Sequence, residues 1–170
     1  MNTGTTANRV YYRVNKDGRT KPQPKIVATG VENRTKVFLK LYWQDYSMRK
    51  KAGDMYWIKT EVLVAIAFAD THLGYATKTK NNVGNVWNTD SWRTWTPKSL
   101  QEWINAIAHT LNNKYFNTKQ TIGDLSFAWN CTINCSKVYA TSNQNWENNV
   151  LNTLSNIYRE NVNPDFRFRK

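Results

Sequence analysis

The chain is poor in the residues that break regular structure or carry metal and redox chemistry. Its 170 residues include seven Gly, four Pro, two Cys and two His. So few Cys and His side chains do not readily complete a zinc site, and the sequence has no phosphate-binding glycine loop, so we expect no metal and no cofactor. No apolar run approaches the ~18 residues that cross a bilayer, which predicts no membrane span.

Acidic residues are also scarce. Twelve Asp and Glu face 24 Lys and Arg, which gives a formal net charge of +12. Such an excess favours anionic partners, namely a cell-wall polymer, an acidic lipid surface or nucleic acid, and nucleic acid rests on charge alone. A hydrophobic fraction of 40%, with eight Trp and nine Tyr, excludes a disordered chain. The first ten residues are polar, so the chain as given shows no signal peptide.

The charge and composition predict one domain with two extensions. Residues 1–35 mix polar and basic residues with Pro22 and Pro24, which indicates an extended basic arm able to pair as an edge strand or to mediate self-assembly. Residues 36–160 form the predicted domain, and 161–170 a basic tail. Deleting the arm should leave the domain folded.

Hydrophobic periodicity predicts a mainly α (α+β) fold. One helix is expected within 36–57, and a second begins at Thr60 and is stopped by Gly74. A third begins either after the Thr96 cap or at the capping box of Ser99 and Glu102. Further helices start at residues 121 and 142, and the residues that favour turns within 81–92 predict one short β-hairpin.

Cys131 and Cys135 lie in a segment with loop composition. Outside the cytoplasm they can form a small disulfide, whereas in a reducing compartment they stay free thiols. Spacing alone leaves both readings open.

Several motifs occur together between residues 59 and 158. The run 64–74 (VAIAFADTHLG) is followed by 80–85 (KNNVGN), then by 121–126 (TIGDLS) and 138–142 (VYATS). In this order they resemble the glucosaminidase branch of the lysozyme-like superfamily, whose members cut the glycan strands of bacterial peptidoglycan. The resemblance implies a lysozyme-like helical domain.

Asp70 occupies the position at which that family has its catalytic Glu. A glycosidase needs a proton donor, and the end of an apolar helix can keep a carboxyl group protonated near neutral pH. The resemblance therefore implies that Asp70 is the general acid, with a side chain one methylene shorter than in the family. The alternative is a structural acid that hydrogen-bonds the following loop.

Asp90, in the predicted hairpin, is the best candidate for a second carboxylate, and its alternative role is that of a turn residue. Glu61 is excluded, because it precedes Asp70 by nine residues, roughly 13.5 Å along the same predicted helix. Sugar rings require apolar faces and amide or hydroxyl groups. Asn81, Asn82, Trp87 and Tyr139 would supply them.

Two functions compete at this stage. The first is a peptidoglycan-binding glycosidase with Asp70 as general acid. The second is a non-catalytic structural protein of a virion or cell-envelope assembly that uses the same fold as a scaffold. Both place the protein in a virion or outside the cytoplasm.

Overall fold

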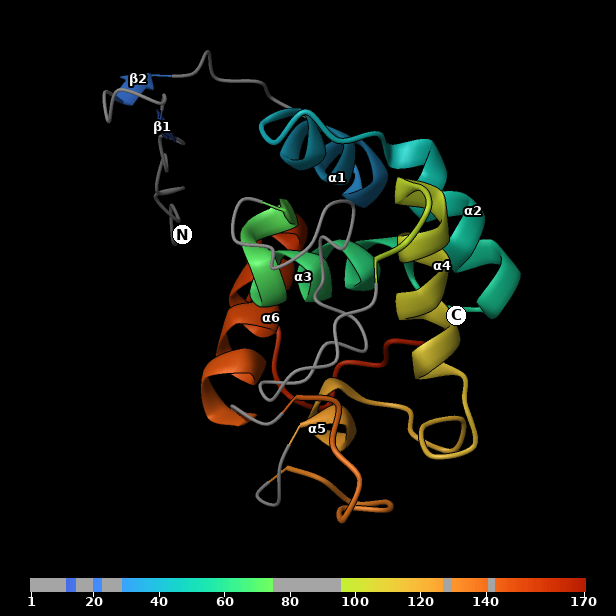
Figure 1. Ribbon diagram of the computed structural model, residues 1–170. Helices are drawn as coiled ribbons and strands as arrows, with labels where there is room; N and C mark the ends of the chain where they lie inside the picture. The colour runs from blue at the N-terminus through green and yellow to red at the C-terminus, as the bar shows by residue number, and fades with distance from the viewer. Residues whose placement is uncertain (1–11, 15–19, 23–28, 75–95, 127–129, 141–142) are drawn as a thin grey trace, which may run out of the picture.

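The computed structural model describes residues 12–14, 20–22, 29–74, 96–126, 130–140 and 143–170. The described part is mainly helical, as predicted (Figure 1). Its helices are α1 (Val31–Lys40), α2 (Tyr46–Tyr56), α3 (Thr60–Thr71), α4 (Leu100–Leu111), α5 (Ile122–Leu125) and α6 (Asn143–Tyr158), with a 3-10 turn, η1 (His72–Gly74), after α3. The hairpin predicted within 81–92 lies outside the described residues.

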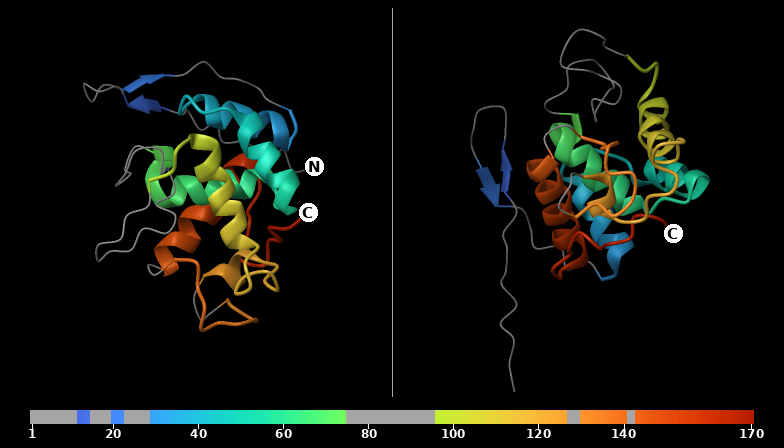
Figure 2. Two further views of the ribbon diagram at one scale, coloured as in Figure 1. Left: turned by 45° about the vertical axis from the view of Figure 1, so that its right-hand side comes forward. Right: turned by 90° about the horizontal axis from the view of Figure 1, so that it is seen from below.

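The strands that the structure describes belong to the predicted arm. β1 (Tyr12–Val14) pairs antiparallel with β2 (Thr20–Pro22), with Arg13 opposite Lys21. The pair contacts no other described element, and Figure 2 shows it apart from the helices. The core is therefore built without it.

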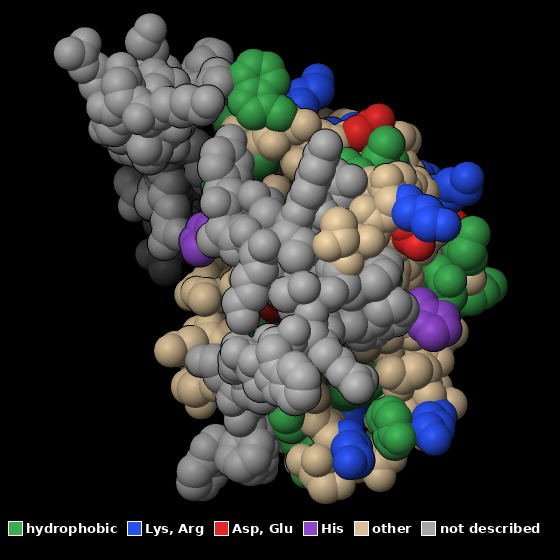
Figure 3. All heavy atoms as spheres, in the orientation of Figure 1, with side chains coloured by type: hydrophobic (Ala, Val, Ile, Leu, Met, Phe, Trp, Pro, Cys, Tyr) green, Lys and Arg blue, Asp and Glu red, His purple; other side chains and the backbone are tan. Residues whose placement is uncertain are grey.

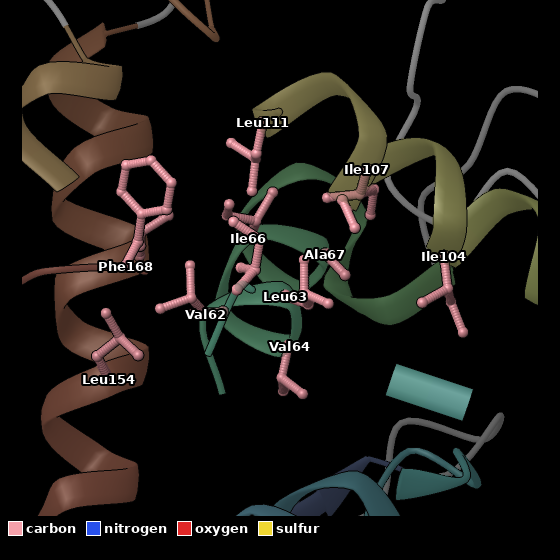
Figure 4. Packing of buried hydrophobic residues seen from close by; sticks show 14 of the residues in the cluster. Val62, Leu63, Val64, Ile66, Ala67, Ile104, Ile107, Leu111, Leu154 and Phe168 are labelled. Atoms are coloured by element: carbon pink, nitrogen blue, oxygen red, sulfur yellow. The ribbon is translucent and has the colours of Figure 1, made fainter. Parts of the chain in front are cut away.

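Helix α3 lies at the centre of the molecule. Every residue from Val62 to Ala67 is buried, because α3 is apolar on all sides and packs against α1, α2, α4 and α6. Figure 4 shows its side chains pointing toward Leu154 and Phe168 on one side and toward Ile104 and Ile107 on the other. The helix ends where His72 adopts a left-handed conformation (φ 51°).

The region predicted as one helix within 36–57 forms two, so this prediction is wrong. A turn separates α1 from α2, and the Asp45 carboxylate caps α2 by accepting the Ser47 N–H at 2.8 Å. α1 begins at Val31, before the predicted domain boundary at residue 35. Arg34, in its first turn, donates to the carbonyls of Ile157 and Tyr158 at the end of α6.

Local capping signals locate two helix starts correctly. Ser99 caps α4 by accepting the Glu102 N–H at 3.1 Å, which selects this cap over Thr96. The helix start predicted at residue 121 is that of α5, where Thr121 and Asp124 form a capping box. The Ser142 cap predicted for α6 lies outside the described residues.

The last ten residues are part of the folded domain rather than a free basic tail. Phe168 is fully buried, and its backbone N–H and carbonyl bond to Gln120 and Lys59. The Arg169 guanidinium donates to the carbonyls of Leu111, Phe116 and Lys119 at 2.9–3.0 Å. Arg167 and Arg169 flank the buried Phe168, and counting charges alone does not reveal this arrangement.

Candidate functional site

Asp70 lies in the last turn of α3, one residue before its end. The preceding turns are apolar and buried, and the carbonyl end of a helix disfavours a negative charge. The residue is half-buried, and desolvation of its carboxyl group disfavours the charged form. The local sequence thus places an acid where its neutral form is favoured.

Trp146 of α6 holds the Asp70 side chain. The buried indole donates its Nε1–H to Asp70 Oδ1 at 2.9 Å. Among the described residues it is the one hydrogen-bond donor to Asp70. The bond also joins α3 to α6, the helix pair that forms the largest part of the core.

Tyr139 completes an aromatic wall beside this acid. Its ring lies 5.3 Å from that of Trp146, tilted by 32°, and 6.2 Å from Phe116 in an edge-on arrangement. Its backbone N–H donates to the Leu125 carbonyl at 2.9 Å. The half-buried phenol therefore has a fixed position near Asp70.

The environment shifts the acid–base behaviour of both groups. Burial raises the pKa of Asp70 to about 8, while the Trp146 hydrogen bond acts in the opposite direction. Burial, and then the negative charge that Asp70 can carry, raise the pKa of Tyr139 well above its ordinary value. At neutral pH the site therefore holds a protonated carboxyl group beside a neutral phenol.

The loop that leads into Tyr139 is fastened at several points. Cys131 and Cys135 form a disulfide, with 5.7 Å between their Cα atoms. Within this loop, Thr132 donates through its N–H and hydroxyl to Asp124 Oδ1. The loop is thus tied both to itself and to α5.

The buried Lys119 side chain also holds this loop, through hydrogen bonds. Its fully buried ammonium group donates to the carbonyls of Asp124, Ile133 and Asn134 at 2.5–3.2 Å. Burial lowers the pKa of Lys119, and the Asp124 charge opposes that shift. The loop that precedes Tyr139 is therefore held in place by the disulfide and by the contacts of Lys119 and Asp124.

Of the residues predicted for the site, the structure brings Asp70 and Tyr139 together. Asn81, Asn82, Trp87 and Asp90 lie outside the described residues. Within the part of the chain that is described, no group of three or more His, Cys, Asp or Glu side chains is placed to hold a metal ion.

Glu61 lies at the opposite end of α3 from Asp70, as the helical spacing requires. Its carboxylate accepts a hydrogen bond from the Tyr158 hydroxyl. Both the carboxylate and the phenol thus serve in packing α3 against α6.

Glu147 is a buried acid that the sequence did not reveal. It follows Trp146 in α6 and accepts hydrogen bonds from Ser126 Oγ and, at 2.6 Å, from Asn130 Nδ2. These contacts hold the start of α6 against the end of α5. No periodicity or motif distinguishes Glu147 from the polar residues around it, so nothing in the sequence could have found it.

Comparisons with protein-family models, with curated proteins and with solved structures give no match for this chain. Across the described residues, none of the helices has the length and hydropathy needed to cross a membrane.

Proposed function

We propose that this protein binds the glycan strands of bacterial peptidoglycan through a lysozyme-like domain, and that Asp70 donates a proton to the glycosidic oxygen. The observation that carries the proposal is the position of the Asp70 carboxyl group at the end of an apolar helix, held by one hydrogen bond from Trp146, where burial raises its pKa to about 8. The motif resemblance supplies the substrate class.

The hydrogen-bond pattern suits proton donation. Oδ1 of Asp70 accepts the indole N–H, so the proton of the neutral carboxyl group is carried most favourably on Oδ2. As the bond between the anomeric carbon and the leaving oxygen breaks, that proton passes to the oxygen. A water molecule adds to the anomeric carbon, and a second carboxylate, for which Asp90 is our candidate, accepts the water proton.

The aromatic wall suits sugar binding. The half-buried Tyr139 places a ring and a hydroxyl next to the acid, with the buried Trp146 packed behind it, and a ring with a polar group is typical of sites that bind carbohydrate. We place Asn81, Asn82 and Trp87 in the same binding site by the resemblance. The positive charge of the chain adds attraction to an anionic cell wall, in keeping with a virion-associated or extracytoplasmic location.

The same hydrogen bond supports a second candidate function. Because it joins α3 to α6, Asp70 can serve folding alone, in a non-catalytic scaffold of a virion or cell-envelope assembly. The two candidates differ in whether the Asp70 proton is transferred.

Replacement of Asp70 by Asn separates the two candidates. The amide oxygen can still accept the Trp146 N–H, but the side chain supplies no acidic proton. For the enzyme, Asp70→Asn should lower release of reducing ends from purified peptidoglycan by about 10²- to 10⁴-fold and leave sedimentation with the polymer unchanged. The exposed Asp165→Asn variant is the matched control and should retain wild-type activity.

Each other outcome has a distinct meaning. Equal sedimentation without hydrolysis in wild type and Asp70→Asn would establish the scaffold, and Asp70→Glu would then test whether the longer acid of the family restores hydrolysis. Hydrolysis that Asp70→Asn leaves intact would exclude Asp70 as the acid. Failure of the wild type to sediment with peptidoglycan would refute glycan binding itself.

A further inference from the structure

Helix α2 ends in an apolar surface that the proposed glycan site does not use. Met55 and Trp57 are 56% and 70% exposed, although large apolar side chains are usually buried. Figure 3 shows hydrophobic side chains gathered at the edge of the molecule beyond α2, with basic side chains beside them. We call Lys51, Met55, Trp57 and Lys170 the Trp57 patch.

The backbone at Trp57 is one that an aromatic residue rarely adopts. Trp57 caps the end of α2 in a left-handed conformation, with φ 55° and ψ 35°. Glycine is the residue that stabilises this position, because a Cβ atom is strained there. An exposed indole at a strained cap contributes little to folding, so its position favours a role in binding.

Positive charge surrounds the two apolar side chains. Lys51 lies one turn before Met55 on the same helix face, is exposed, and has no carboxylate partner among the described residues. Asp54, the acid of this region, is shared between Lys50 and Lys170. The Lys170 backbone N–H donates to the Trp57 carbonyl at 3.0 Å, and its ammonium group pairs with Asp54, so this basic residue lies at the end of α2.

We propose that the Trp57 patch docks the protein on an anionic lipid surface. Tryptophan favours the headgroup level of a bilayer, a neighbouring apolar side chain such as Met55 can enter the acyl boundary, and lysines attract anionic lipids. Peripheral binding typically needs two such weak signals together, and this patch has both. A nucleic-acid strand would use the indole face and the charge but would leave Met55 without a role.

Co-sedimentation with vesicles tests the assignment on the full chain. Wild type should bind vesicles of phosphatidylcholine and phosphatidylglycerol in equal parts more tightly than vesicles of phosphatidylcholine alone. Trp57→Ala should weaken binding to the mixed vesicles by at least about tenfold, the value expected for losing a buried aromatic side chain. Lys51→Ala should weaken it by about fivefold, the contribution of one lysine near an anionic leaflet.

Control variants test whether the loss of vesicle binding is specific to the Trp57 patch or follows from removing any exposed Trp or Lys. Trp43 is 72% exposed and also left-handed, but α2, a helix about 16 Å long, separates it from Trp57. Trp43→Ala should bind like wild type, and Lys114→Ala, which removes one exposed charge elsewhere, should lose less than Lys51→Ala. Trp57→Gly should melt no lower than wild type yet lose vesicle binding.

Four results would overturn the proposal. In the first two, Trp57→Ala binds vesicles as well as wild type does, or Trp43→Ala loses as much vesicle binding as Trp57→Ala. In the third, Trp57 is needed to bind single-stranded oligothymidine and the protein does not bind vesicles. In the fourth, Trp57 is needed for dimers in sedimentation equilibrium and the protein does not bind vesicles. The last two would assign the patch to nucleic acid or to a second copy of the chain.

Discussion

At the scale of single residues, the ionisation of Asp70 should control stability above about pH 4. Its folded-state pKa of about 8 exceeds the ordinary aspartate value, so the folded protein holds a proton that the unfolded chain releases. Stability is therefore full below the ordinary pKa and declines as the pH rises through 8.

Asp70→Asn should remove this decline. Urea unfolding of the wild type should show a loss on the order of a few kcal/mol between about pH 5 and about pH 9, since each pKa unit corresponds to about 1.4 kcal/mol and the side chain retains some solvent contact. The variant should lose much less over the same range. Parallel pH profiles of the two proteins would show that Asp70 is ionised at neutral pH.

Buried polar side chains are the residues that the sequence could not assign. Arg49, Lys119 and Glu147 are all buried. Arg49 stacks 5.7 Å from the Trp103 ring, and burial lowers its pKa to about 10. Most of their partners lie in distant segments or are backbone carbonyls, and local composition reveals neither kind of contact. By contrast, motif order rather than burial predicts that Asp70 and Tyr139 belong to one site, and the structure places them near each other.

At the scale of elements, the sequence predicts helices well where local chemistry decides them. The caps at Ser99 and Thr121 act within one turn, so reading the chain locally finds them. The break between α1 and α2 was missed because the apolar spacing continues across it, and the Asp45 cap was not recognised. The C-terminal segment was missed because its pairing partners lie far away in sequence.

Two truncations test where the folded domain begins. Removing residues 1–28 deletes a strand pair that touches no other described element, so the free energy of unfolding should change by no more than about 0.5 kcal/mol. Removing 1–35 also deletes the first turn of α1 with buried Thr35 and the Arg34 contacts to α6.

The longer truncation should therefore cost several kcal/mol or abolish the cooperative melt. Thermal unfolding followed by circular dichroism distinguishes the two variants. Equal loss in both would mean that the arm itself supports the core, and equal retention in both would mean that the start of α1 is dispensable.

At the scale of the whole molecule, we expect Asp124 to contribute to the acid limit of stability. Burial alone would raise its pKa, but hydrogen bonds from Thr132, Gln120 and Thr121 outweigh burial and lower it to about 2. Its contribution is present above the ordinary pKa near 4 and is lost as the pH falls through 2. Together with Asp70, this predicts greatest stability in a mildly acidic window.

Asp124→Asn should shift that acid limit. The variant should be less stable than wild type at about pH 6, because an amide cannot accept every bond that the carboxylate accepts, and its stability should fall by on the order of 2 kcal/mol less on acidification to about pH 2. Urea midpoints across this range provide the measurement. If wild type and variant lose the same stability on acidification, another group is responsible for that loss.

The buried position of Phe168 also constrains how the chain can fold while it is being synthesised. Lys59 and Gln120 each bond to the backbone of this residue, and Lys170 meets Asp54 across most of the sequence. The first helices to leave the ribosome thus lack their final neighbours, and α3, apolar on all sides, stays exposed in the meantime. Nascent chains that end before residue 168 should therefore be bound by chaperones through α3, and release should follow only when the closing segment has emerged.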